Sequence, residues 1–93
     1  MAAERAGAAG LKTVLFEKKA LGGVCLNEGC IPTKTLLYSA KLYHYTQEGK
    51  RYGVHAQDAA YSYAEFLKRK EKVVRKLVAG VKAAVRNAGV QLV

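Results

Sequence analysis

One long stripe of apolar side chains does most to limit what this chain of 93 residues can fold into. From position 63 to position 87, apolar residues recur at steps of three and four, which is the spacing of one helix face. The stripe consists of Phe66, Val73, Val74, Leu77, Val78, Val81 and Val85. Ser62 followed by Glu65 is a capping-box pattern, and the pair Ala88 and Gly89 suits a helix end. We therefore predict a helix from Tyr63 to Asn87.

Two further helices are predicted before this one. Met1 to Ala9 is rich in helix formers, and Gly10 can end a helix. Pro32 can occupy the first turn of a second helix, from about Thr33 to Gln47, because its missing N–H would be unpaired there. Gly49 to Gly53 should break that helix. Its apolar side is predicted to contain Leu36, Leu37, Ala40, Leu42 and Tyr43.

Two short runs predict β-strands, so the fold class is α/β and mostly helical. Lys12 to Glu17 (KTVLFE) and Val90 to Val93 are apolar or β-branched. Lys18 to Gly29 is rich in glycine and predicts a loop, and Tyr52 to Ala60 predicts a loop with a short extended piece. A lone strand exposes unpaired N–H and C=O groups on both edges. The first strand has no partner strand before it and the last is only four residues long, so both ends look cut and we expect an incomplete domain.

The chain is strongly basic, and the excess is concentrated in the long helix. The formal charge is +9, from 16 Lys and Arg against 7 Asp and Glu, and half of these bases lie between Lys68 and Arg86. Such an excess of positive charge can bind an anionic partner, such as nucleic acid, a membrane surface or a phosphorylated cofactor. A solvated helix face opposite the valine stripe explains it more simply. A basic nucleic-acid-binding helix, centred on KRKEKVVRK, stays an alternative function.

Composition points to the cytoplasm. No apolar run approaches the roughly 18 residues that span a bilayer. Met1 to Gly10 lacks the basic-then-apolar layout of a signal peptide. Two cysteines in such a chain are not a secreted disulfide scaffold. We therefore expect a cytoplasmic protein that binds no membrane.

The two cysteines lie in the segment GGVCLNEGCIPTK, which runs from Gly22 to Lys34. Cys25 and Cys30 would close a small loop, which needs tight backbone that Gly29 can supply. Cys30 should lie just before a helix start, where the helix dipole favours a thiolate and speeds exchange. Two buried, unrelated cysteines are the plain alternative. A zinc site would need His44 or His55, and neither spacing fits a zinc finger.

The same segment resembles the redox signature of the pyridine-nucleotide disulfide oxidoreductases, G-G-x-C-x-N-x-G-C-x-P-x-K. All eight fixed positions match, namely Gly22, Gly23, Cys25, Asn27, Gly29, Cys30, Pro32 and Lys34. The variable positions and the continuation Thr35, Leu36 and Leu37 resemble the dihydrolipoamide dehydrogenase branch. The resemblance covers essentially the whole chain and is strongest from Leu11 to Lys41.

The resemblance implies roles for individual residues. Cys30 would lie against the flavin of FAD, and Cys25 would exchange with the substrate disulfide. Lys34 would lie near the flavin N5 position. Glu17, at the end of its strand, would accept hydrogen bonds from the ribose of the adenosine half. The two glycines at the start of the motif, Gly22 and Gly23, would let the backbone approach the cofactor.

It also implies a larger enzyme. Residues 1–93 would be an incomplete, Rossmann-like FAD-binding domain, with the NAD and interface domains absent from the chain. The implied reaction passes electrons from dihydrolipoamide, or a lipoyl-bearing protein, through the cysteine pair and FAD to NAD. The complete enzyme would be a homodimer that binds neither nucleic acid nor membrane.

One expected motif is missing. The dinucleotide fingerprint G-x-G-x-x-G should precede Glu17 by about 20 residues. Counting back from Glu17 leaves the chain, and Gly7 and Gly10 have the wrong spacing. The first strand and its glycine-rich loop are therefore expected to be absent, and the isolated chain to be inactive and partly folded. A small stand-alone thiol redox protein stays a further alternative.

Overall fold

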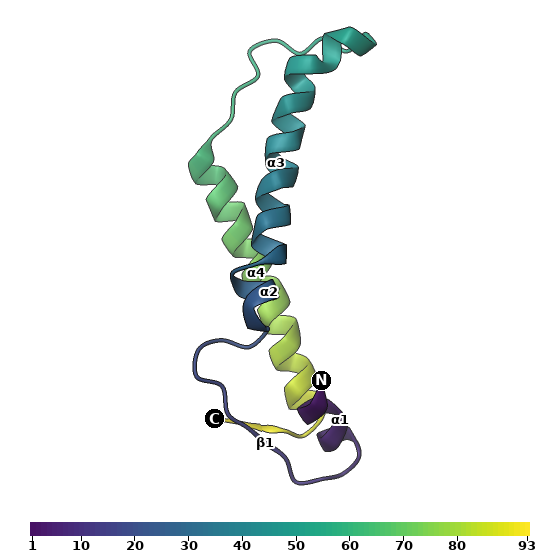
Figure 1. Cartoon of the computed structure of the whole chain (residues 1–93), viewed down its shortest axis with the longest axis vertical. Helices are drawn as coiled ribbons and strands as arrows, with labels where there is room; N and C mark the ends of the chain where they lie inside the picture. The colour runs from purple at the N-terminus through teal and green to yellow at the C-terminus, as the bar shows by residue number, and fades with distance from the viewer.

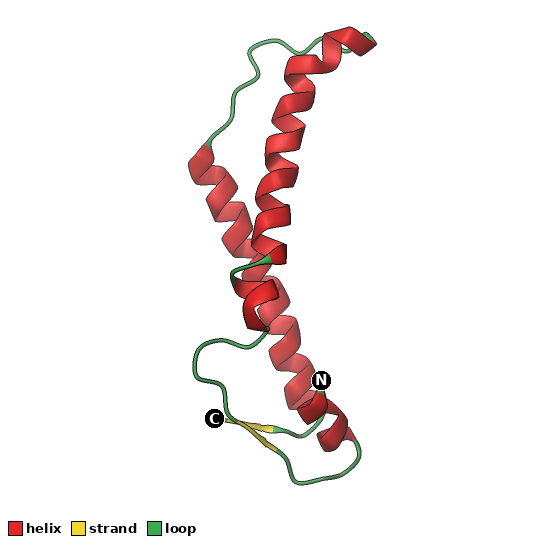
Figure 2. Cartoon of the chain, in the orientation of Figure 1, coloured by secondary structure: helices red, strands yellow, loops and turns green.

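Two long helices run side by side in opposite directions and give the molecule an elongated shape (Figure 1). The structure is a computed structural model that describes all of residues 1–93, with extents of 60 × 23 × 16 Å. The two helices are α3 (Cys30–Glu48) and α4 (Tyr63–Asn87), and a loop joins them at one end of the molecule. A small sheet and the chain termini lie at the other end (Figure 2).

Helix α4 has the bounds predicted from its apolar stripe. The Ser62 side-chain oxygen accepts a hydrogen bond of 3.3 Å from the backbone N–H of Glu65, which fixes the first turn. The helix ends at Asn87 with Ala88 as its C-cap, and Gly89 follows with a φ of +76°. Within the stripe, Val85 is the buried residue. The basic side chains of the helix form no ion pair within the chain.

Helix α3 starts earlier than the sequence suggested. Cys30 is its first residue, Gly29 is the N-cap, and Pro32 is its third residue. The N–H groups of the first turn all lack a helical acceptor, so proline fits at the third position as well as at the first. A 3₁₀ helix, η1 (Gly49–Tyr52), follows, and Gly53 ends it with a φ of +82°.

The predicted apolar side of α3 is only partly covered. Leu36 and Tyr43 are half-buried, whereas Leu37 and Leu42 are 62% and 48% exposed. The buried residue of this helix is Thr35, whose hydroxyl donates to the carbonyl of Ile31 at 2.8 Å. The chain thus leaves much apolar surface of α3 uncovered.

The two predicted strands pair with each other, so neither is a lone strand. Strands β1 (Val14–Leu15) and β2 (Gln91–Leu92) are parallel, with Val14 opposite Gln91. The Glu17 N–H extends the ladder by donating to the carbonyl of Val93 at 3.1 Å. A parallel pair needs a long crossover, and the helices between the strands supply it.

Helix α1 (Ala2–Ala8) packs beside this sheet against the end of α4. A side chain at Gly7 would overlap the carbonyl oxygen of Ala88, so glycine permits the close approach. Gly10 follows α1 with a φ of +86°, as its position suggested. The buried apolar residues are Leu21, Val85 and Val90, which lie around this end of the molecule. No helix has the length and apolarity needed to cross a bilayer.

The segment from Lys18 to Gly29 is not a loop throughout, which corrects the prediction. It contains a short helix, α2 (Gly23–Asn27), which carries Cys25. The glycines of the segment suggested a loop, but Gly22 and Gly23 form the turn into α2, and Gly29 forms the turn after it. These turns bring α2 against the start of α3.

Candidate redox site

The turn before Cys25 depends on two glycines. Gly22 and Gly23 have φ values of +109° and +70°, which side-chain-bearing residues rarely adopt. A Cβ atom on Gly22 would overlap the side chain of Leu26, whereas one on Gly23 would meet open space. The glycines turn the chain sharply into α2, and so place Cys25 in its middle.

Asn27 holds the same turn from the other side. Its side-chain amide donates hydrogen bonds of 2.9 Å to the carbonyl oxygens of Leu21 and Gly23. Leu21 is only 6% exposed, so this end of the turn is anchored in the core. The sequence identified Asn27 only as a fixed position of the motif, and the structure shows that its side chain stabilises the turn. It ties the entry of α2 to its last residue.

Gly29 lets the chain fold back on the first cysteine. A Cβ atom at Gly29 would lie 3.1 Å from the carbonyl oxygen of Val24 and 3.3 Å from the Cα of Cys25. Such contacts are too short for comfortable packing, so glycine permits the close approach of the two turns. The next residue, Cys30, begins α3. Both cysteines therefore stand at one junction between two helices.

Cys30 affects the pKa of Cys25 at this junction. Both are free and exposed. The pKa of the Cys25 thiol is raised, first by hydrogen bonding with the Cys30 side chain and then by loss of surrounding water. The positive charge of Lys34, one helical turn beyond Cys30, acts in the opposite direction and lowers the pKa of Cys25. An interacting pair of this kind can close to a disulfide when it loses two electrons and two protons.

A cavity of about 350 Å³ opens next to this junction. Glu17 and Gly23 line it together, although neither cysteine does. The Glu17 carboxylate accepts a hydrogen bond of 3.1 Å from the backbone N–H of Lys19. Lys19 also forms an exposed ion pair with Glu28 on the rim, which raises the pKa of Lys19 and lowers that of Glu28.

The structure therefore brings the predicted site residues together in two neighbouring groups. At the α2–α3 junction Cys30 and Lys34 both affect the pKa of Cys25, and Glu17 and Gly23 share the cavity. Nowhere in the chain do three His, Cys, Asp or Glu side chains gather as ligands for a metal ion.

Comparison with known proteins gives the arrangement its context. No protein-family model matches the chain. Dihydrolipoyl dehydrogenase from Mycoplasma genitalium is 50% identical over 92 residues, which are 98% of this chain and 20% of that protein. Dihydrolipoyl dehydrogenase from Bacillus subtilis is 40% identical over 99% of this chain and 19% of its own. Over nearly all of its length the chain is therefore similar to dihydrolipoyl dehydrogenases, the branch that its GGVCLNEGCIPTK segment resembles. It spans about a fifth of the length of these curated relatives.

A solved structure has the same fold. LpdA from Mycobacterium tuberculosis superposes with a TM-score of 0.82 over 98% of this chain and 20% of its own, at 20% sequence identity. The likeness shows that the helical pair and its small sheet form one coherent part of a longer fold. The similarity to dihydrolipoyl dehydrogenases rests on the sequence identities.

Proposed function

We propose that this chain provides the redox-active dithiol and part of the FAD-binding domain of a dihydrolipoyl dehydrogenase. The placement of two exposed thiols at one junction, Cys25 within α2 and Cys30 at the first turn of a 19-residue helix, carries the proposal. Buried, unrelated cysteines would have neither this exposure nor the effect that Cys30 has on the pKa of Cys25. Similarity to dihydrolipoyl dehydrogenases along the whole of this chain supports the same conclusion.

The residues of this chain fit one part of FAD. The Glu17 carboxylate, at the edge of the cavity, is a suitable acceptor for ribose hydroxyls. Gly23 lines the same cavity and carries no side chain to obstruct it. Donors for the pyrophosphate are lacking, because the chain contains no G-x-G-x-x-G loop. We propose a Rossmann-like FAD domain of which residues 1–93 form a portion.

The proposed chemistry takes place at the two sulfurs. In the oxidised pair, a thiolate of dihydrolipoamide attacks Cys25, the Cys25–Cys30 bond breaks, and Cys30 leaves as a thiolate. The second substrate thiol then attacks the mixed disulfide and releases Cys25, which keeps a proton because its pKa is raised. Two electrons have then passed from substrate to the pair. FAD, when bound, supplies the acceptor that returns the pair to its disulfide.

Two other features of this chain support that division of roles. Cys30 has the N-terminal turn of α3 around it, and a helix N-terminus stabilises a thiolate. Lys34 adds a positive charge that lowers the pKa of Cys25. In the complete enzyme we propose that this charge lies beside the flavin N5 position and favours negative charge on the ring. NAD as final acceptor, further NAD and interface domains, a homodimer and a cytoplasmic location complete the proposal.

Thiol exchange on the full 93-residue chain tests the pairing directly. The reduced chain is treated with glutathione disulfide, and the products are separated by mass. One cysteine should attack the reagent, and the other should then displace glutathione to leave an internal disulfide. Cys25→Ser and Cys30→Ser, as matched controls, should each accumulate a glutathione adduct. A doubly glutathionylated wild-type chain would overturn the proposal.

A further inference from the structure

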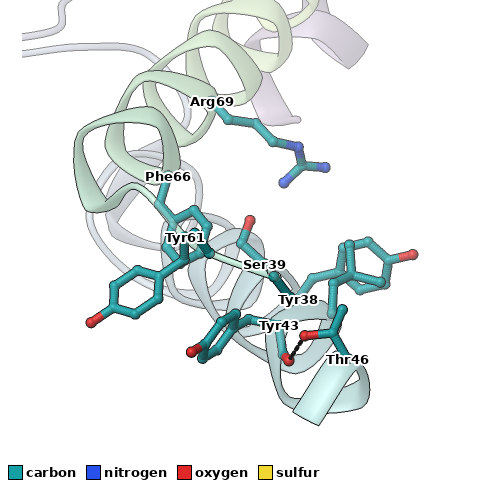
Figure 3. Close-up of a pocket in the computed structure, with 10 residues that line it drawn as sticks. Tyr38, Ser39, Tyr43, Thr46, Tyr61, Phe66 and Arg69 are labelled. Atoms are coloured by element: carbon teal, nitrogen blue, oxygen red, sulfur yellow. Dashed lines mark hydrogen bonds between the residues drawn. The ribbon is translucent and has the colours of Figure 1, made fainter. Parts of the chain in front are cut away.

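A second cavity lies well away from the dithiol, between the two long helices (Figure 3). It has a volume of about 300 Å³ and is lined mainly by apolar residues. Leu42 and Tyr43 come from α3, Tyr61 from the loop before α4, and Phe66 from the first turns of α4. Leu42 is twelve positions beyond Cys30, or about 18 Å along the helix axis. The cavity therefore does not belong to the redox site.

Three aromatic rings form one wall of this cavity. The rings of Tyr43 and Tyr61 meet edge to face, with centroids 4.9 Å apart at 65°. Tyr61 and Phe66 stack, with centroids 5.9 Å apart at 26°. These contacts join α3, the loop and α4, and so hold the wall in place. A wall of this kind favours a flat aromatic ligand, which can stack or meet the rings by their edges.

Two hydroxyls of the cavity already donate hydrogen bonds to backbone carbonyls. The Thr46 hydroxyl donates to the Tyr43 carbonyl at 2.6 Å, and the Ser39 hydroxyl donates to the Thr35 carbonyl at 3.4 Å. The charged residue of the lining is Arg69, which comes from α4. Figure 3 shows its guanidinium extending past Ser39 toward the Tyr38 side of the cavity.

Arg69 has no acidic partner in the chain. The two ion pairs of the structure join Lys19 to Glu28 and Arg51 to Glu48, and the cavity lining contains no carboxylate. Arg69 is exposed and lines the cavity. Its guanidinium can bind a carboxylate through two parallel hydrogen bonds. An apolar pocket with one oriented charge is the usual form of a small-molecule site.

We propose that this cavity binds a small aromatic carboxylate. The ring lies against Tyr43, Tyr61 and Phe66, and the carboxylate pairs with Arg69. This site is independent of the proposed redox function, since it shares no residue with the dithiol or with the Glu17 cavity. Its volume suits an acid of one or two rings.

The test is an NMR titration of the full 93-residue chain with 2-naphthoate and with 2-naphthamide, its uncharged isostere. Naphthoate should shift the backbone signals of residues 38–46 and 59–69, and it should bind about tenfold more tightly than the amide. Equal affinity for the two probes, or shifts centred on residues 22–34, would overturn the proposal.

Variants separate the specific site from general attraction to a basic protein. Arg69→Ala should weaken naphthoate about tenfold and leave naphthamide unchanged. Arg75→Ala is the matched control, because Arg75 is exposed on the same helix but lies outside the cavity lining. It should bind naphthoate as the wild type does. An equal loss in both variants would mean that net charge alone attracts the probe, and the proposal would fail.

The aromatic wall is tested by a pair of variants at Tyr61. Tyr61→Phe keeps the ring and should bind both probes normally, whereas Tyr61→Ala should weaken both. Circular dichroism reports whether Tyr61→Ala keeps its helices. If it does not, the comparison of Tyr61→Phe with Arg69→Ala still decides the matter. Normal binding by a helical Tyr61→Ala chain would contradict the proposed wall.

Discussion

The side-chain amide of Asn27 donates a 2.9 Å hydrogen bond to the backbone carbonyl of Leu21, six residues earlier. Leu21 is buried, so this bond fixes the turn that carries Cys25 to the core of the molecule. We predict that Asn27→Ala loosens the turn and lowers the share of internal disulfide formed with glutathione disulfide. Each lost hydrogen bond should lower the free energy that favours the closed turn by about 1 kcal/mol. Gln47→Ala, at an exposed position of α3, is the control, and an equal share of disulfide in the two variants would refute this role for Asn27.

The glycine turn should be sensitive to a single methyl group. Gly22→Ala should destabilise the chain by about 1–3 kcal/mol, because φ is +109° and the new Cβ atom overlaps Leu26. Gly80→Ala is a matched control in the interior of α4, where a Cβ atom meets nothing within 4 Å. It should stabilise the chain by about 0.5–1 kcal/mol. Urea unfolding followed by circular dichroism measures both, and equal effects would contradict the account of Gly22.

The reactivity of Cys25 should respond in opposite directions to its two neighbours. The pKa of Cys25 is raised mainly by Cys30 and lowered by Lys34. Cys30→Ala should therefore lower the pKa of Cys25, and Lys34→Ala should raise it further. The pH dependence of alkylation by iodoacetamide reports the thiolate. Its midpoint should move to lower pH in Cys30→Ala and to higher pH in Lys34→Ala. Shifts of the same sign would contradict this arrangement.

The chain alone should not retain FAD. It contains no G-x-G-x-x-G loop to bind the pyrophosphate, although Glu17 is available for the ribose. We expect the purified chain, mixed with FAD, to lose its flavin absorbance on gel filtration. A yellow protein peak that persists through the column would contradict this prediction.

The two cysteines should differ in a complete flavoenzyme that contains this segment. Cys25→Ser should leave the Cys30 thiolate beside oxidised flavin and give a long-wavelength absorption band without reduction. Cys30→Ser should bind FAD without that band, and both variants should lose turnover with dihydrolipoamide. A band in Cys30→Ser alone would reverse the assigned roles.

The local features of the fold were readable from the sequence, whereas the long-range ones were not. The helix from Tyr63 to Asn87 and its Ser62 cap follow from periodicity and capping chemistry, which act within a few residues. Helix α2 was missed because five residues between glycines carry too little periodic signal. The pairing of Val14 with Gln91 joins opposite ends of the chain, and two short apolar runs do not specify their neighbours.

For the candidate site too, the sequence predicted the local features and missed those that depend on the path of the chain. The spacing of Cys25 and Cys30, with the fixed positions around them, predicted a reactive pair, and this stays a prediction. The structure places both exposed thiols at the α2–α3 junction. The hydrogen bonds that Asn27 donates to the turn depend on the path of the backbone, which no spacing rule specifies. The cavity that Arg69 shares with Tyr43 forms only where two helices and a loop meet. No motif in either segment indicates it.

The parallel pairing of β1 with β2 has a consequence for the order in which the parts of the molecule form. The contacts that shape the cysteine turn join residues at most six positions apart, whereas Val14 must find Gln91 across nearly the whole chain. Closing so large a loop costs more entropy and is slower than local folding. We therefore expect the dithiol to reach its geometry early, while the polypeptide is still being synthesised. The sheet that positions Glu17 must wait until residue 93 has been made.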